Sequence, residues 1–147
     1  MTPHEKDLVI GIDHVQLAAP ARCESEARKF FGDLLGLEEI AKPESLRSRG
    51  GCWFRVGPRQ LHIGIEENFS AARKAHPAFA TRDIIALSER LERSGVLVSW
   101  DDSVDRIRRF YVQDPWGNRL EFTEPTHSGC LGARKIARKQ TYRCLFD

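Results

Sequence analysis

The sequence has little net charge and lacks any long apolar run. Its 23 lysine and arginine residues nearly balance 21 aspartate and glutamate residues, which leaves a formal net charge of +2. So weak an excess argues against a nucleic-acid-binding surface over the whole chain. No stretch approaches the ~20 apolar residues that a membrane-spanning helix needs, and residues 1–7 are too polar for a signal peptide. We therefore expect a cytoplasmic protein with neither a nucleic-acid nor a membrane partner.

The four cysteines lack the spacing of a zinc site or of a redox motif. Cys23, Cys52, Cys130 and Cys144 include no CxxC pair and no zinc-ribbon arrangement. In a reducing cytosol they are expected to be free thiols. Cys23 could act as a nucleophile, but a structural or surface thiol is the commoner role of such a residue.

The chain does contain a repeated order of strands and helices, and the first copy runs from residue 8. A β-rich strand over 8–18 is followed by a helical period over 21–35, which ends before a glycine, and by a short strand over 38–41. A hairpin then joins strands over 52–56 and 60–65. This first copy reads β, α, β, β, β.

The same order restarts after a polar linker. A short strand over 76–81 precedes Asp83, which is a good N-cap for an amphipathic helix that ends at Gly95. A strand over 96–100 and a hairpin over 108–123, through the turn sequence Asp-Pro-Trp-Gly-Asn, complete the copy. The sequence thus predicts an α+β domain of paired βαβββ units, with helices on one side of curved sheets.

Metal-ligand types recur on the strand faces that point away from the helices. In each unit the non-core face of the first strand starts with a histidine, His14 or His76. The last strands carry His62 and Glu121 between apolar neighbours, so strand alternation turns both away from the core. Imidazoles and a carboxylate suit one Zn²⁺, Ni²⁺, Co²⁺, Mn²⁺ or Fe²⁺ ion and leave positions open for substrate. The four residues predict one divalent-metal site, although a single strand histidine is more often structural.

The same alternation places further side chains beside the predicted metal. Gln16, Trp53, Arg55 and Arg109 would bind substrate, with the tryptophan as a flat apolar wall and the arginines as cations for a carboxylate or phosphonate. Tyr111 could donate a proton or only pack. The arginines could instead be solvated or paired with acids, for which Glu66 and Asp114 are candidates.

Four segments resemble the glyoxalase/bleomycin-resistance/dioxygenase superfamily, also called vicinal oxygen chelate proteins: DHVQLAAP, FFGDLLGL, WFRVGPRQLHIG and DPWGNRLEFTEP. The resemblance covers about residues 8–125, and DPWGNRLEF is its most specific stretch. It implies two modules, over 8–67 and 76–125, that form a U-shaped metal-binding cleft, often across a homodimer. It also implies a metal that holds a small oxygenated substrate and stabilises an oxyanion.

Carried over by position, the metal ligands that the resemblance implies are His14, His62, His76 and Glu121. Glyoxalase I usually has a glutamate where this chain has His62, which disfavours lactoylglutathione lyase activity. The other three residues match the triad of extradiol dioxygenases and fosfomycin thiol transferases. His62 is then either a fourth metal ligand or a residue that contacts and orients a ligand without binding the metal itself.

Two functions follow as expectations. The first is a metal-dependent enzyme, of lyase, isomerase or dioxygenase type, that acts on a small anionic substrate, with Glu121 and Tyr111 as its catalytic residues. The alternative is a binding protein that sequesters a drug or metabolite without chemistry, as bleomycin-resistance members do. The tail over 126–147, with five basic residues between Arg134 and Arg143, is expected to be a basic extension. It could instead be swapped onto a second copy, and its basic residues lack the aromatic spacing of a nucleic-acid-binding segment.

Overall fold

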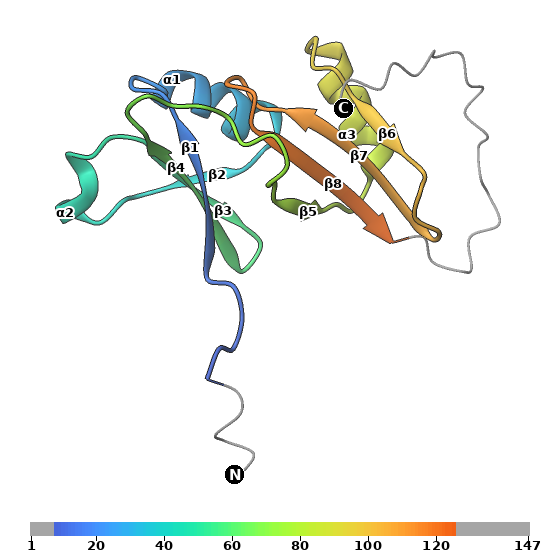
Figure 1. Cartoon of the computed structure of the whole chain (residues 1–147), viewed down its shortest axis with the longest axis horizontal. Helices are drawn as coiled ribbons and strands as arrows, with labels where there is room; N and C mark the ends of the chain where they lie inside the picture. The colour runs from blue at the N-terminus through green and yellow to red at the C-terminus, as the bar shows by residue number, and fades with distance from the viewer. Residues whose placement is uncertain (1–7, 126–147) are drawn as a thin grey trace.

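The structure, a computed structural model, describes residues 8–125 and contains two four-stranded sheets (Figure 1). The predicted basic tail lies outside the described residues. The first sheet comprises β1 (His14–Ala19), β2 (Glu38–Ile40), β3 (Cys52–Val56) and β4 (Arg59–Ile65), in the order β1-β4-β3-β2. β1 runs parallel to β4, and the other neighbours are antiparallel.

The second sheet repeats this topology. It comprises β5 (Ala78–Ala80), β6 (Ser99–Asp101), β7 (Ile107–Gln113) and β8 (Arg119–Pro125), in the order β5-β8-β7-β6. β5 is parallel to β8, as β1 is to β4. The expected α+β fold of paired βαβββ modules is therefore confirmed. The strand boundaries moved by one to three residues in most cases, as is usual for element ends.

The predicted first helix forms, but not as one regular α-helix. A single turn, α1 (Glu24–Ala27), runs into the π-helix η2 (Arg28–Leu34), whose end is marked by a bond from the Leu35 N–H to the Phe30 carbonyl. Gly36 follows with φ of 74°, a conformation that favours glycine. The loop after β2 contains the short helix α2 (Glu44–Arg47).

The helix of the second module matches its prediction closely. Helix α3 (Ile84–Arg93) begins after Asp83, whose side chain accepts a hydrogen bond from the Ala86 N–H, as an N-cap does. Its buried residues Ile84 and Leu91 face the sheet. Among the described residues, no helix is long and apolar enough to cross a membrane.

The core follows the alternation of the strands. Phe54, Leu61 and Ile63 are buried in the first sheet, and Phe110 and Leu120 in the second. Because side chains alternate along a strand, their neighbours lie on the opposite face of each sheet. Each sheet therefore has one apolar face toward its helices and one face of polar and aromatic residues.

The first predicted strand is shorter than its β-rich sequence suggested. Residues 8–13 lie outside any sheet, and β1 begins only at His14. Leu8, Val9 and Ile10 are 85–93% exposed. Since β propensity depends on a neighbouring strand to pack against, an apolar run at a chain end stays unpaired where no such strand is in reach.

A buried hydrogen-bond network joins the two modules at the Asp-Pro-Trp-Gly-Asn turn. The Asn118 side-chain amide donates to the Ala18 carbonyl of β1 at 2.8 Å and to the Asp114 carboxylate at 2.7 Å. Asp114 also accepts from the backbone N–H groups of Trp116 and Asn118. Burial raises the pKa of Asp114, against the effect of these donors. The turn thus fixes the second module to the edge of the first sheet.

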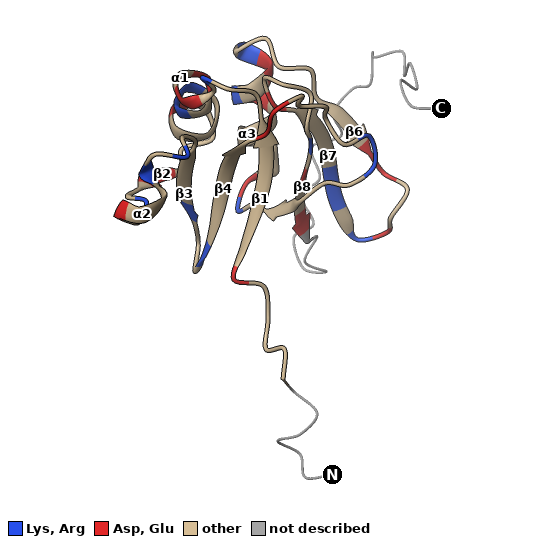
Figure 2. Ribbon diagram, turned by 60° about the vertical axis from the view of Figure 1, so that its left-hand side comes forward, with Lys and Arg blue, Asp and Glu red and all other residues tan. Residues whose placement is uncertain are grey.

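Charged residues are interspersed along both modules (Figure 2). Several basic side chains of the first module form ion pairs at the surface, such as Arg28 with Glu39 at 2.8 Å. Surface pairs of this kind contribute little to stability. They do agree with a chain whose net charge is close to zero.

Candidate metal-binding half-sites

The first pair of predicted ligands lies in a stack of three rings on the polar face of the first sheet. His62 lies between Trp53 and His14, with centroid distances of 3.7 Å and 4.1 Å and interplanar angles of 2° and 19°. The register of the sheet explains the contact with Trp53, since Trp53 is the antiparallel neighbour of His62. The two rings bury His62 to 4% exposure, and this burial, with the nearby His14, lowers its pKa.

His14 is the accessible member of this pair. Its Nδ1–H donates to the Asp13 carboxylate at 2.8 Å, and this hydrogen bond lowers the pKa of Asp13. The bond leaves the lone pair on Nε2, and a carboxylate behind one ring nitrogen is the usual arrangement of a metal-binding histidine. The side chain is 43% exposed, so Nε2 can reach a ligand from solvent.

The second pair meets beside the second sheet, where Glu121 lies on β8 and His76 lies two residues before β5. His76 Nδ1–H donates to the Lys74 carbonyl at 2.8 Å, and His76 Nε2 lies 2.9 Å from Glu121 Oε2. A carboxylate oxygen can only accept, so Nε2 meets it as a hydrogen-bond donor, or the two atoms can be ligands of one cation. Both side chains are largely buried.

The separation of these two atoms suits a bound ion. Two ligand bonds of about 2.1 Å that meet at 90–110° place their donor atoms roughly 3.0–3.4 Å apart. The observed 2.9 Å between His76 Nε2 and Glu121 Oε2 is within a few tenths of an ångström of that range. The pair therefore fits two ligands of one divalent ion with a small side-chain movement.

Aromatic and basic side chains surround Glu121. Arg109 is 3.4 Å from Glu121 Oε1 and donates to Asp101 at 2.8 Å and to Ser103 at 3.0 Å. The Tyr111 ring lies edge-on to His76 at 5.5 Å. Burial, followed by the Glu121 charge, raises the pKa of Tyr111, so its hydroxyl stays protonated at neutral pH.

The other residues predicted to bind substrate, Trp53, Gln16 and Arg55, differ in their contacts. Trp53 forms the floor of the ring stack, and Gln16 lies directly over Gly64, where an added Cβ would come within 2.6 Å of its amide nitrogen. Arg55 is exposed and pairs with Glu38 at 2.9 Å. The arginines thus pair with acids other than the two that the sequence suggested. Their roles toward substrate stay predictions.

One residue of this surface was missed from the sequence. The Arg119 guanidinium lies 4.0 Å from the centre of the Tyr111 ring, a cation–π contact. Arg119 is two residues before Glu121 on β8, so the alternation that placed Glu121 on this face would also have placed Arg119 there. Asp101 and Ser103, which accept hydrogen bonds from Arg109, lie at the end of β6 and in the loop after it. The sequence there has no strand or helix periodicity that would predict their position.

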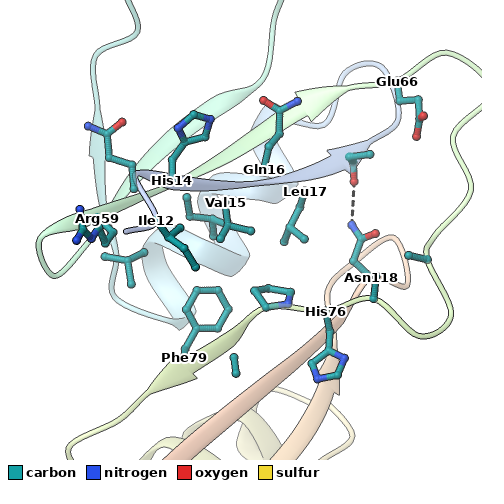
Figure 3. Close-up of a pocket in the computed structure, with 18 of the residues that line it drawn as sticks. Ile12, His14, Val15, Gln16, Leu17, Arg59, Glu66, His76, Phe79 and Asn118 are labelled. Carbon is teal, nitrogen blue, oxygen red and sulfur yellow. Dashed lines mark hydrogen bonds between the residues drawn. The ribbon is translucent and has the colours of Figure 1, made fainter. Parts of the chain in front are cut away.

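The two pairs do not meet within one chain. Among residues 8–125, no three histidine, cysteine, aspartate or glutamate side chains are grouped closely enough to hold an ion. His14 and His76 lie on opposite sides of a cavity of about 800 Å³ between β1 and β5 (Figure 3). All four residues 14–17 of β1 line this cavity; Val15 and Leu17 point toward Phe79 of β5, whereas the side chains of His14 and Gln16 lie on the opposite side of β1 (Figure 3). Each module therefore carries half of the predicted ligand set.

Paired βαβββ modules of this topology, with histidine and carboxylate side chains opposite the apolar faces of the sheets, define a class of αβ domains. The model of the glyoxalase/bleomycin resistance protein/dioxygenase superfamily matches residues 11–122. The chain belongs to this superfamily. The resemblance seen in the sequence is thereby confirmed.

Solved structures of the superfamily share the fold. A Bacillus anthracis protein assigned to the glyoxalase family is 50% identical, with a TM-score of 0.80 over 82% of this chain and 98% of its own. A glyoxalase/dioxygenase from Nostoc punctiforme is 19% identical, with a TM-score of 0.67 over 80% and 92% of the two chains. A variant of the fosfomycin resistance protein FosX from Listeria monocytogenes, solved with Mn(II) and 1S,2S-dihydroxypropylphosphonic acid, is 20% identical, with a TM-score of 0.67 over 81% and 95%. Among curated proteins, no match is found.

Proposed function

We propose that this protein is a homodimeric, divalent-metal-dependent enzyme that acts on a small anionic oxygenated substrate. Each of two clefts would combine His14 of one copy with His76 and Glu121 of the other. The observation that carries the proposal is the division of the ligand set into two preformed halves that face away from each other in one chain. In a C₂ dimer, the first half-site of each copy can face the second half-site of the other copy, so one interface would complete two metal sites.

The local geometry supports metal ligation by these residues. His14 and His76 each donate Nδ1–H to an oxygen, at 2.8 Å in both cases, which leaves Nε2 as the nitrogen that would bind an ion. Glu121 lies beside one of these nitrogens. The FosX variant, whose fold this chain shares, was solved with Mn(II). An ion bound at these residues would stabilise negative charge on a substrate oxygen.

The surrounding residues supply the rest of the proposed chemistry. Tyr111 is protonated at neutral pH and can donate a hydrogen bond, or a proton, to a substrate oxygen. Arg109 and Arg119 flank that ring, so an anionic group of the substrate would meet positive charge there. Glu121 is the carboxylate best placed to accept a proton. The phosphonate in the FosX structure is an example of the substrate class that we propose.

Metal analysis of the purified protein tests the proposal. After growth with added Mn²⁺, Zn²⁺ or Ni²⁺, we expect about one ion per chain and a particle of twice the chain mass. Glu121→Gln should lose most of the ion. Glu124→Gln serves as the matched control, because Glu124 lies on the same strand and pairs with Arg108. Metal-free wild-type protein after such growth would overturn the proposal.

A second candidate, a non-catalytic binding protein, is favoured by a different observation. The Trp53–His62–His14 stack is a flat aromatic surface of the kind that binds planar ligands. Such a protein would bind its ligand with unchanged affinity after Glu121→Gln. Equal binding by wild type and variant, together with no turnover, would favour this candidate.

A further inference from the structure

The ring stack on the first sheet restricts which of its histidines can bind an ion. An imidazole nitrogen binds metal through a lone pair that lies in the plane of the ring, at about 2.0–2.1 Å. Two rings that bind the same ion must therefore have planes that meet close to both nitrogens. The His14 and His62 rings are 4.1 Å apart and inclined by only 19°.

These numbers place the meeting line of the two planes far from any ligand position. Rings in contact keep their atoms about 3.5 Å or more apart, so with centroids 4.1 Å apart and an inclination of 19° the two planes intersect roughly 10–12 Å from the rings, several times a metal–nitrogen bond length. In this arrangement the two histidines cannot both bind one ion. One of the rings would have to turn.

The contacts decide which ring is free to turn. His62 is 4% exposed, lies parallel to Trp53 within 2°, and donates Nε2–H to the Gln60 side-chain oxygen at 2.9 Å. His14 is 43% exposed and has a ring on one face only. Turning His62 would break two ring stacks and a partly buried hydrogen bond, whereas turning His14 breaks one stack and its exposed hydrogen bond to Asp13.

We propose that His62 is a positioning residue that holds the His14 ring in its binding orientation, and that it is not itself a metal ligand. This inference rests on the proposed function, in which His14 binds the ion. Trp53 supports His62 from behind, so the three rings form one stacked column that ends in the accessible Nε2 of His14. A flat ring at position 62 would then suffice, and its nitrogens would be dispensable.

A pair of substitutions separates the two roles. His62→Phe keeps a flat ring in the stack but removes both nitrogens, and His62→Ala removes the ring. We expect His62→Phe to keep the affinity for Mn²⁺ within about threefold and His62→Ala to lose about 10–100-fold, as outer-shell partners do. Pulsed electron paramagnetic resonance of the Cu²⁺-loaded protein should count the same number of coordinated imidazoles in wild type and His62→Phe. Loss of one imidazole signal in His62→Phe, or equal loss of affinity in both variants, would overturn the assignment.

Proton NMR of the metal-free protein tests the positioning without any bound ion. The His14 ring protons should be shifted upfield by the neighbouring ring in wild type and in His62→Phe, and should return to ordinary values in His62→Ala. Unshifted His14 protons in wild type would contradict the proposal. A wild-type protein that binds no metal would refute the proposed function, and this NMR comparison would still decide the role of His62.

Discussion

Mixing two inactive variants should restore metal binding if the half-sites of two copies combine. In a His14→Ala dimer, both clefts lack the ligand from the first module, and in a His76→Ala dimer both lack one from the second. Each variant alone should bind its ion more weakly by more than the roughly 100-fold that loss of an outer-shell partner can cost. In a mixed dimer, one cleft receives both defects and the other receives none.

The size of the recovery follows from random pairing. When equal amounts of the two variants are unfolded and refolded together, half of the dimers should be mixed, and each should contain one intact cleft. The mixture should then bind about a quarter of the ions that wild type binds, with wild-type affinity. The measurement is a titration with Mn²⁺ under competition from a chelator, on the refolded mixture and on each variant refolded alone.

A second mixture provides the control. His76 and Glu121 lie in the same half-site, 2.9 Å apart, so mixing His76→Ala with Glu121→Ala leaves every cleft with a damaged second half. That mixture should recover nothing. If the mixture of His14→Ala and His76→Ala also binds no more Mn²⁺ than each variant refolded alone, the metal ligands of one site do not come from two copies. The division of the site between copies would then be refuted.

Three further predictions concern residues outside the half-sites. Asn118→Ala should lower the free energy of unfolding by about 2–4 kcal/mol in urea titrations, because the buried Asp114 carboxylate and the Ala18 carbonyl each lose a hydrogen-bond donor. The control Ser94→Ala removes an exposed hydrogen bond to the Arg90 carbonyl and should change this free energy little. Burial raises the pKa of Cys52 to about 11, so at pH 8 only about one Cys52 thiol in a thousand is ionised. A disulfide reagent should therefore label Cys52 at least 100-fold more slowly in folded than in unfolded protein. Equal labelling rates would contradict the burial of Cys52. If the exposed apolar residues Leu8, Val9 and Ile10 (the N-terminal arm) pack on the second copy, Ile10→Asp should raise the dissociation constant of the proposed dimer roughly 10–100-fold, as measured by sedimentation equilibrium. An equal effect of Leu97→Asp, at an exposed loop site, would speak against a specific role of the arm.

The parts of the fold that the sequence predicted well depend on local periods. Alternation in β4 placed Leu61 and Ile63 in the core and His62 on the opposite face, and all three lie as expected. The N-cap residue Asp83 fixed the start of α3. These features follow from side-chain direction and backbone hydrogen bonding within a few residues, which a single sequence displays.

Features that depend on distant contacts could not be predicted in this way. Asn118 and Ala18 are a hundred residues apart, and neither marks the other as a partner. The π-helical turn at Arg28–Leu34 has the same apolar residues as the predicted α-helix, so the pattern does not reveal the wider turn. The ring stack was equally hidden, because alternation gives the face of Trp53, His14 and His62 but not the angles between their rings.

The division of the metal ligands follows from one packing choice between the modules. Val15 and Leu17 project from the helix side of β1, and Phe79 projects from the helix side of β5, and these residues line the cavity between the two strands (Figure 3). Because alternate side chains of a strand point to opposite faces, contact through the helix sides turns the polar faces of the two sheets away from each other. His14 and His76 are then separated whatever their own conformations. Substituting Phe79 by aspartate should therefore weaken the contact between modules and expose apolar surface, yet it should leave the stack of Trp53, His62 and His14 intact, which the ring-current shifts of the His14 protons would report. Loss of those shifts would mean that the first half-site depends on the second module, although its three rings contact one another within the first sheet.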